Sequence, residues 1–174
     1  MQLLKLMRPQ QWYKNIVIFI GIFFTGQVTN IPLLWNVFLG FISLCLISSC
    51  NYVINDIVDR KRDQLHPEKK HRPIASGKVK ASSAFIFAII LLIASVFLAI
   101  YITSLNFTIA NRFLWTVIFL FVFTQFYSLF LKQEPFADIL AIAINFIARA
   151  MAGVYIIKAD FSPWLIAATF FMSL

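Results

Sequence analysis

The sequence contains little charge, and negative charge is the scarcest of all. Only 13% of its 174 residues are charged, and Asp and Glu together account for seven. Apolar residues make up 61% of the chain, and the mean hydropathy is +0.84. This composition lies far outside the range of soluble globular domains. It therefore indicates that the lipid bilayer is the solvent.

Cysteine is nearly absent as well. The two cysteines, Cys45 and Cys50, lie in one long apolar stretch. Such a pair offers neither a disulfide framework nor the ligand spacing of a zinc site. We therefore predict a packing role for both thiols.

The long apolar stretches that the sequence does contain predict helices that cross a membrane. Each approaches the roughly 20 residues that span a hydrocarbon core, although the first is short. No small-x-small cleavage site follows the first stretch, so we expect a retained anchor and not a signal peptide. The pattern predicts an all-α, polytopic transmembrane helical bundle with six spans or partial spans. The predicted spans are residues 15–27, 32–55, 83–104, 111–131, 136–157 and 161–174.

The distribution of basic residues predicts the orientation of this bundle. Three Lys or Arg residues precede the first span, eight lie between the second and third, and each later connection holds one. The two large groups fall on the same side of an alternating topology, and the positive-inside rule places that side in the cytoplasm. We therefore expect an integral protein of the inner (cytoplasmic) membrane, with the N-terminus and the 60–80 loop facing the cytoplasm.

Four of the seven carboxylates lie within thirteen positions, where the second span meets its loop. At about 100° per residue, Asp56, Asp59 and Asp63 share one helix face, and Tyr52 lies one turn earlier on that face. Asn55 stands beside this stripe, where its amide could hold a substrate oxygen or orient a ligand.

Two interpretations of the acidic stripe are open. Like charges so arranged repel one another unless a cation lies between them, and hard oxygen ligands suit magnesium shared with a phosphate-bearing substrate. Alternatively, the stripe is a solvated helix end whose acids pair with the neighbouring bases. Those bases are Arg60, Lys61 and Arg62.

A compact basic loop follows the acids. Residues 66–78 hold four Lys or Arg residues, two His and three breaker residues, which indicates an ordered loop. Lys69 and Arg72 are candidates for anion contacts, Arg through its planar fork and Lys as a point charge. We expect His66 and His71 to be ordinary surface imidazoles without a catalytic role.

The fifth predicted span carries polar residues within its apolar sequence. Asp138, Asn145 and Arg149 lie on one helix stripe, because Asn145 and Arg149 each deviate by roughly 20° from the direction of Asp138. Ionisable groups inside a span usually face a cavity or a partner. Two roles are open for these residues. They could form a structural Asp–Arg ion pair between helices, or Arg149 could contact a donor phosphate.

Two linked motifs resemble the UbiA superfamily of intramembrane transferases. Asn55-Asp56-x-x-Asp59-x-x-x-Asp63 is similar to its Asp-rich signature, and Arg72-Pro73-Ile74-Ala75-Ser76-Gly77 follows at the expected separation. The resemblance implies that Asp56, Asp59 and Asp63 are catalytic and bind Mg²⁺. It also implies a bundle of about nine helices, so residues 1–174 are expected to be the N-terminal part of one truncated domain. Residues 56–82 would be its cytoplasmic active-site loop region.

Within that superfamily, the chain resembles the decaprenyl-phosphate phosphoribosyltransferase branch. The similarity lies in Arg8-Pro9-Gln10-Gln11-Trp12-Tyr13-Lys14-Asn15, in His66-Pro67-x-Lys69-x-x-Arg72, and in the segment from Tyr127 to Gly153. It implies 5-phosphoribosyl 1-diphosphate as donor and a polyprenyl phosphate as acceptor. The residues expected to bind substrate are Lys14, Tyr52, Asn55, Lys69, Arg72, Tyr127, Lys132 and Arg149.

Two other functions are compatible with parts of this pattern. A UbiA-type prenyltransferase, which moves a prenyl group from its diphosphate to an aromatic or other acceptor, would use the same three aspartates. A membrane transporter could bury Asp138 and Arg149 along a polar pathway, although it would not explain the tandem motifs. We expect membrane lipids as surroundings and no nucleic acid partner, and homo-oligomerisation is left open.

Overall fold

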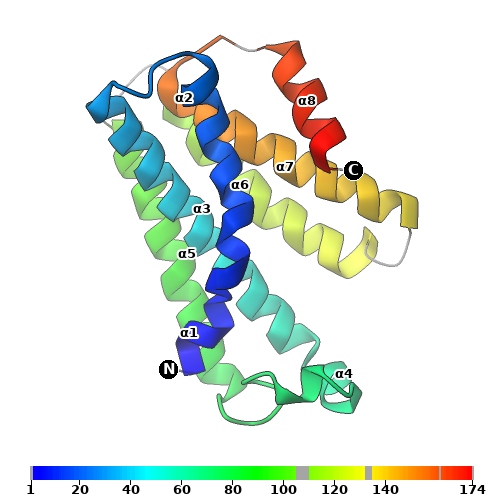
Figure 1. The fold of residues 1–174 in the computed structure, drawn as a ribbon. Helices are drawn as coiled ribbons and strands as arrows, with labels where there is room; N and C mark the ends of the chain where they lie inside the picture. Colours follow the sequence, from blue (N-terminus) through cyan, green and yellow to red (C-terminus); the bar gives the residue numbers. More distant parts are fainter. Residues whose placement is uncertain (1, 105–109, 132–134, 161, 174) are drawn as a thin grey trace.

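The protein is a bundle of helices (Figure 1). The computed structural model describes residues 2–104, 110–131, 135–160 and 162–173, and no strand occurs among them. This confirms the predicted all-α class. In chain order the elements are α1 (Gln2–Met7), the 3₁₀ helix η1 (Pro9–Phe19), α2 (Ile20–Phe24), α3 (Ile31–Val58), α4 (Arg60–Leu65), the 3₁₀ turn η2 (Lys69–His71), α5 (Ala81–Ser104), α6 (Ala110–Phe126), the π-helical turn η3 (Tyr127–Leu131), α7 (Pro135–Ile157) and α8 (Pro163–Ser173).

Four helices are long and apolar enough to cross a membrane, which makes this an integral membrane protein. They correspond to the second, third, fourth and fifth predicted spans, in α3, α5, α6 with η3, and α7. The sixth predicted span, which was expected to be partial, contains α8, an apolar helix of 11 residues. At about 1.5 Å per residue, such a helix covers roughly half of a hydrocarbon core.

The first predicted span differs from the structure, because its helical segment begins earlier than residue 15 and winds more tightly than an α-helix. The 11 residues of η1 are a 3₁₀ helix and continue into the five residues of α2. A 3₁₀ helix rises about 2.0 Å per residue, so η1 and α2 together extend roughly 30 Å, which matches the hydrocarbon core. The tighter winding gives a period of three, which aligns Trp12, Asn15 and Ile18 on one side.

That side of η1 packs against α3 and α7. Trp12 Nε1 donates to Ser49 Oγ on α3 at 3.1 Å, and Ile18 is fully buried. A Cβ at Gly153 on α7 would lie only 1.8 Å from the carbonyl oxygen of Ile18. Only glycine therefore allows η1 to approach α7 this closely.

Small side chains join α3 to α5. The buried face of α5 carries Ala84, Ala88, Ser95 and Ala99, which let the two backbones come close. Ser95 Oγ donates to the carbonyl of Ser43 at 2.9 Å, and Ser43 Oγ donates back to the carbonyl of Ser95 at 2.9 Å. This reciprocal pair satisfies both hydroxyls inside the bundle.

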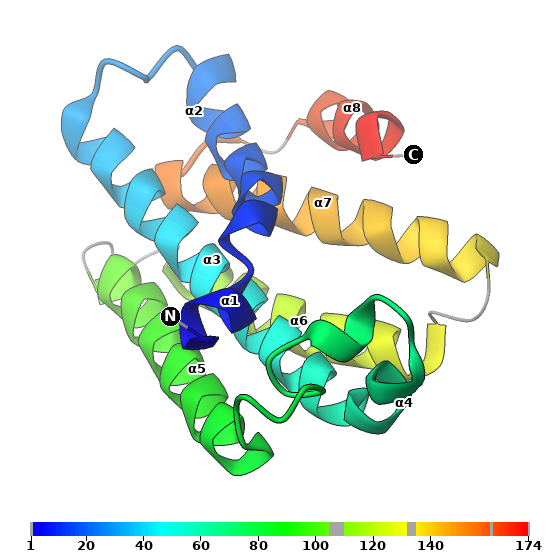
Figure 2. The ribbon, with the colours of Figure 1, turned by 60° about the horizontal axis from the view of Figure 1, so that its bottom comes forward.

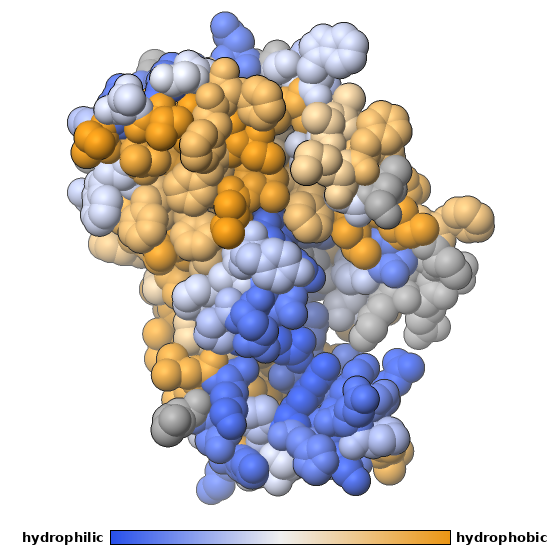
Figure 3. All heavy atoms as spheres, in the orientation of Figure 1, coloured by the Kyte–Doolittle hydropathy of each residue, from blue (hydrophilic) through white to orange (hydrophobic). Residues whose placement is uncertain are grey.

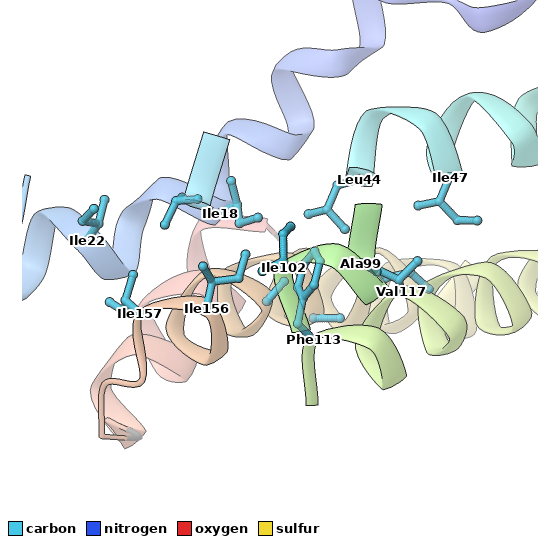
Figure 4. Close-up of a cluster of buried hydrophobic side chains, with 14 residues drawn as sticks. Ile18, Ile22, Leu44, Ile47, Ala99, Ile102, Phe113, Val117, Ile156 and Ile157 are labelled. Atoms are coloured by element: carbon cyan, nitrogen blue, oxygen red, sulfur yellow. The ribbon is translucent and has the colours of Figure 1, made fainter. Parts of the chain in front are cut away.

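Two clusters of buried apolar side chains hold the elements together. The larger one joins η1, α2, α3, α5, α6 and α7 at the centre (Figure 4). The smaller one includes Leu6, Val53 and Ile74, and so holds α1 and the basic loop against α3. Cys45 and Cys50 are buried free thiols, as their predicted packing role requires.

The chain brings its N-terminus and the 59–80 segment to the same end of the bundle. Helix α1 and helix α4 both lie at the lower end in Figure 1, and Figure 2 shows them from that side. The two large groups of basic residues therefore share one end, as the alternating topology predicted. Hydrophilic residues gather there, and a hydrophilic strip reaches from that end toward the middle of the face in Figure 3.

Candidate active site

Two buried carboxylates and two guanidinium groups form an ion-pair cluster at the polar end. The side chains of Asp56 and Asp63 are each only 3% exposed. Arg8 Nη2 lies 2.5 Å from Asp56 Oδ1. Arg72 Nη1 lies 3.1 Å from the same oxygen and 2.7 Å from Asp63 Oδ2. Arg72 therefore bridges the two carboxylates.

Asp56 and Asp63 of the predicted acidic stripe stay on one face although their helix is interrupted. Helix α3 ends at Val58, Asp59 caps it with ψ near 0°, and α4 begins at the next residue. The Asp63 N–H still donates to the Asp59 carbonyl at 2.8 Å, and the Asp59 N–H donates to the Asn55 carbonyl at 2.8 Å. Because the turn continues through the break, Asp56 and Asp63 face the same guanidinium.

The alternative partners that the sequence offered for these acids are not the ones found. Asp56 and Asp63 pair with Arg8 and Arg72, which come from 48 and 16 positions away from Asp56. The nearby bases Arg60, Lys61 and Arg62 form no ion pair with either carboxylate in the described structure. Pairing with the neighbouring bases therefore does not account for Asp56 and Asp63.

Arg8 is a site residue that the sequence prediction left out. It has a left-handed backbone (φ 50°) at the junction between α1 and η1, and its guanidinium lies 5.1 Å from the Tyr52 ring centroid. Non-glycine residues in this conformation are uncommon, and they cluster at functional sites. The Arg8-Pro9 pair in the N-terminal motif was the signal that could have identified it.

The basic loop is folded so that Arg72 points at the carboxylates. Ile74 is fully buried beneath it, and the Val79 N–H donates to the Pro73 carbonyl at 2.9 Å. Gln64 Nε2 donates to the Ala75 carbonyl at 3.2 Å, which ties the loop to α4. His66 accepts through Nδ1 from the Glu68 N–H at 3.2 Å, so this imidazole shapes the loop. The loop is thus ordered, as predicted.

A second group of cations lies nearby, on η1 and α7. Arg149 Nε donates to Asn15 Oδ1 at 2.9 Å, and Asn15 is itself buried and donates to Cys45 Sγ at 3.4 Å. Lys14 is close enough to Arg149 for the two charges to repel each other. Tyr52 lies within electrostatic reach of both Arg8 and Arg149.

The polar stripe predicted on α7 is divided among three neighbours. Asp138 Oδ1 accepts from the Tyr127 hydroxyl at 2.5 Å, and Asn145 Oδ1 accepts from Thr124 Oγ1 at 3.2 Å. Arg149 turns instead to Asn15 on η1. The structural Asp–Arg tie considered for this helix is therefore not formed; each polar group joins α7 to a different element.

The remaining predicted residues lie in different surroundings. Asn55 is half-buried on α3, one turn before Asp59, and Lys69 is partly exposed in η2. Lys132 lies outside the described residues. A further contact was not predicted: Gln125 Nε2 donates to Asn51 Oδ1 at 2.7 Å and joins α6 to α3.

An apolar cavity of about 370 Å³ lies at the other end of the molecule. It is formed by α2, α8 and the connection between α7 and α8, with Phe24, Val154 and Leu165 among its lining residues. This cavity is remote from the ion-pair cluster, which lies beside α4 (Figure 1).

The donors of the carboxylate cluster fit a magnesium ion chemically. Asp56 and Asp63 present only oxygen atoms, which Mg²⁺ prefers, and a cationic group already lies between them. In the part of the chain that the structure describes, no three His, Cys, Asp or Glu side chains are gathered closely enough to form a metal site. Arg72 fills the position between the two aspartates.

Comparison with known proteins places these features in a family. Residues 15–174 match the profile described as "UbiA prenyltransferase family". Decaprenyl-phosphate phosphoribosyltransferases of Corynebacterium glutamicum and Mycobacterium tuberculosis are each 30% identical, over 99% and 98% of this chain and 51% and 55% of their own lengths. An uncharacterized protein, y4nM of Sinorhizobium fredii, is 29% identical over 97% of this chain and 32% of its own length. The chain thus spans between a third and just over half of these curated relatives.

The fold is shared with a solved protein as well. The structure of a UbiA homolog from Archaeoglobus fulgidus bound to DMAPP and Mg²⁺ superposes with a TM-score of 0.77 at 20% identity, covering 99% of this chain and 60% of that one. At this identity the likeness concerns the fold alone. Because the family profile covers nearly all of the sequence and the bundle agrees, the chain belongs to the UbiA prenyltransferase family.

Proposed function

We propose that this chain belongs to a Mg²⁺-dependent intramembrane transferase that moves 5-phosphoribosyl from 5-phosphoribosyl 1-diphosphate to a polyprenyl phosphate. The observation that carries the proposal is the buried cluster of Asp56 and Asp63 with Arg8 and Arg72. Acids and bases brought from three separate segments to one end of an apolar bundle suit a charged donor at the membrane surface. Similarity to phosphoribosyltransferases over almost the whole chain supports this branch.

Asp56, Asp59 and Asp63 are the proposed metal ligands. When bound, the ion would neutralise the charge that develops on the departing diphosphate. The carboxylates would exchange their present guanidinium partner for the metal, and Arg72, together with Lys69, would turn toward the diphosphate oxygens. A bidentate Arg–phosphate contact makes that exchange favourable for Arg72.

No protein nucleophile is required for the transfer. An oxygen of the lipid phosphate forms a bond to the anomeric carbon of ribose, while the bond from that carbon to diphosphate breaks and diphosphate leaves with the electron pair. The attacking oxygen is already anionic, so no proton is removed. The chain's role is to hold both groups in line, with Asn55, Tyr52, Tyr127 and Lys132 proposed as further substrate contacts.

A prenyltransferase is the second candidate. It is favoured by a digeranylgeranylglyceryl phosphate synthase of Sulfurisphaera tokodaii, 28% identical over 79% of this chain, and by the solved UbiA homolog bound to GPP and Mg²⁺. This reaction would use the same aspartates, because its donor also carries a diphosphate. For either reaction, the positive-inside rule applied to the basic N-terminal and 60–80 segments supports a site on the cytoplasmic side.

Binding of the donor tests the proposal directly. The full-length protein would be purified in detergent and its melting temperature measured with Mg²⁺ and either 5-phosphoribosyl 1-diphosphate or geranylgeranyl diphosphate. A ligand that binds the native state raises apparent stability. We expect a Mg²⁺-dependent rise with the phosphoribosyl donor, which is lost in Asp63→Asn and kept in Asp160→Asn, an exposed carboxylate at the opposite end.

The other outcomes of this experiment are equally informative. A rise with the prenyl donor alone would assign the protein to the prenyltransferases. A rise that persists in Asp63→Asn would remove the carboxylate cluster from the donor site, and no rise with either donor would contradict the proposed function.

A further inference from the structure

A groove of about 460 Å³ lies between α6 and α7, at the end of the bundle opposite α4. Helix α5 leaves the polar end after the basic loop, α6 runs back toward that end, and α7 returns to the opposite one. Figure 1 shows the end of α7 beside α2, away from α4. At about 100° per residue, the groove residues Met151 and Tyr155 lie more than 100° around α7 from Arg149. The groove therefore faces away from the polar stripe of α7.

The interior of this groove is apolar. Thr116 and Ala148 are buried residues of its lining, and the Thr116 hydroxyl is satisfied because it donates to the Arg112 carbonyl at 2.8 Å. The side chains of Trp115 and Phe119 also line the groove and are exposed, so they stand at its rim on α6. A chain-like apolar ligand would therefore meet hydrocarbon and aromatic surface along the groove.

One end of the groove carries a positive charge. Arg112 is the only charged residue in the described lining, and its guanidinium lies 5.8 Å from the ring centroid of Tyr155. Its side chain is exposed, and no carboxylate pairs with it in the part of the chain that the structure describes. Arg112 also lies in the first turn of α6, where the helix dipole favours an anion. This end of the groove is therefore complementary to a negatively charged group.

The groove has the depth of one leaflet of a bilayer. Both of its helices are long and apolar enough to cross a membrane. At about 1.5 Å per residue, Arg112 to Phe119 spans about 10 Å of α6, and Ile144 to Tyr155 spans about 16 Å of α7. Half of a hydrocarbon core is about 15 Å. Tyr155 near the end of α7 and Trp115 near the start of α6 are of the types that favour the membrane–water interface.

We propose that this groove binds an anionic phospholipid from the leaflet at the end opposite α4. Its headgroup phosphate would lie on Arg112, whose planar fork matches a phosphate, and one acyl chain would extend past Trp115 toward Ile144. The apolar cavity beside α8 is a poorer fit, because its described lining includes Asp160 and no Lys or Arg. The groove lies at the other end of the bundle from the carboxylate cluster, so this inference does not rest on the proposed function.

The test measures lipid binding at Trp115 itself. The full-length protein, with its other tryptophans replaced by Phe, would be reconstituted into vesicles of phosphatidylcholine that contain brominated phosphatidylglycerol or brominated phosphatidylcholine. A brominated acyl chain quenches the fluorescence of an adjacent indole, so the two quenching curves give the relative affinity of the two lipids at this site. We expect phosphatidylglycerol to be preferred about fivefold, which is the effect of one Arg near a lipid phosphate.

Two matched controls separate the groove from the general surface. Trp35 is also exposed, lies near the start of α3 at the same end, and lines a groove that is apolar throughout its described lining. With Trp35 as the single tryptophan, the two lipids should bind about equally. In the Trp115 protein, Arg112→Gln should abolish the preference, whereas Lys158→Gln, an exposed cation at the end of α7 outside the groove lining, should leave it unchanged.

The contrary outcomes are specific. Equal affinities of the two lipids at Trp115, or a preference that persists in Arg112→Gln, overturn the proposal. An equal loss in Lys158→Gln would assign the preference to surface charge in general and overturn it as well. If neither lipid quenches Trp115 while both quench Trp35, a protein surface covers the groove, either a second copy or another helix of the full-length protein, and no lipid is bound there.

A second measurement needs no tryptophan substitution. Native mass spectrometry of the full-length protein counts the phosphatidylglycerol molecules that stay bound when detergent is removed. We expect one fewer in Arg112→Gln than in wild type, and the wild-type number in Lys158→Gln. An unchanged number in Arg112→Gln would overturn the proposal even if the single-tryptophan protein does not fold.

Discussion

The two ends of this bundle differ in what they bury: one buries charged side chains and the other apolar ones. Beside α4, the guanidinium groups of Arg8 and Arg72, from two separate segments, converge on two buried carboxylates. Beside α2 and α8, an apolar cavity is lined almost entirely by hydrophobic groups. Burying charge is expensive unless it is paired, whereas burying apolar surface is not. The convergence at the α4 end is therefore the feature that marks the candidate functional site.

Both ends depend on one close contact between η1 and α7, and breaking it should have the largest effect. Gly153→Ala would force a Cβ to within 1.8 Å of the Ile18 carbonyl oxygen, so the two helices must separate. We expect a loss of at least about 3 kcal/mol in the free energy of unfolding. The measurement is denaturant unfolding in detergent.

The control for this change is Gly26→Ala. Gly26 has φ +66° but nothing within 4 Å of its Cβ position, so only conformational strain of about 1 kcal/mol is expected. Equal losses for the two variants would contradict the close packing of η1 on α7.

The next largest effect should come from breaking the bridge at the polar end. Arg72→Gln leaves Asp63 buried without its described ion-pair partner, which should cost about 3 kcal/mol at neutral pH. Arg60→Gln, at an exposed position on α4, should change stability by less than about 0.5 kcal/mol. The melting temperatures of the two variants measure the difference. Comparable shifts would mean that Arg60 also contributes to neutralising the carboxylates.

A smaller effect is expected where apolar packing supports the polar end. Leu6 is fully buried against α3, whereas Leu4 on the same short helix is 61% exposed. Leu6→Ala should cost about 2–3 kcal/mol, and Leu4→Ala should be nearly neutral. If thermal unfolding does not separate these variants, α1 is not docked on the bundle.

The smallest effect should come from a single hydroxyl. Tyr127→Phe removes the hydrogen bond to Asp138 that joins η3 to α7, and we expect a loss of about 1–2 kcal/mol. Tyr101→Phe, at an exposed position, should be silent in the same unfolding measurement. A silent Tyr127→Phe would leave this bond without a role in stability and would favour a substrate contact.

Much of the architecture was predictable because apolar length and helical period are local properties. The four long spans and the common end of the two basic groups followed from them. The helical segment that contains the first span begins earlier than predicted, at Pro9, because nothing in the apolar pattern reports that η1 winds as a 3₁₀ helix. The side-by-side placement of Asp56 and Asp63 was predicted from spacing, since the turn continues through the helix break.

The partners of the polar residues were not predictable in the same way. Pairing of the acids with Arg60, Lys61 or Arg62 was one of the two interpretations left open, but Asp56 pairs with Arg8, 48 positions away. Likewise, Arg149 pairs with Asn15 across 134 positions, and Asp138 joins Tyr127 instead of another helix's arginine. The local sequence therefore predicted most of the residues that make these polar contacts, though not Arg8, and it did not predict which ones meet.

The sequence by itself thus determined that this is a helical membrane protein with an acidic stripe and a basic loop at one end. Composition, span length and charge asymmetry depend only on the order of residues and on the cost of exposing them to lipid. The tertiary structure alone decided that Arg8 and Arg72 neutralise the aspartates while Lys14 and Arg149 remain without a described counter-charge. The reason is physical: electrostatic pairing depends on distance in space, and that distance is set by how η1, α3 and α7 pack, down to the missing side chain of Gly153.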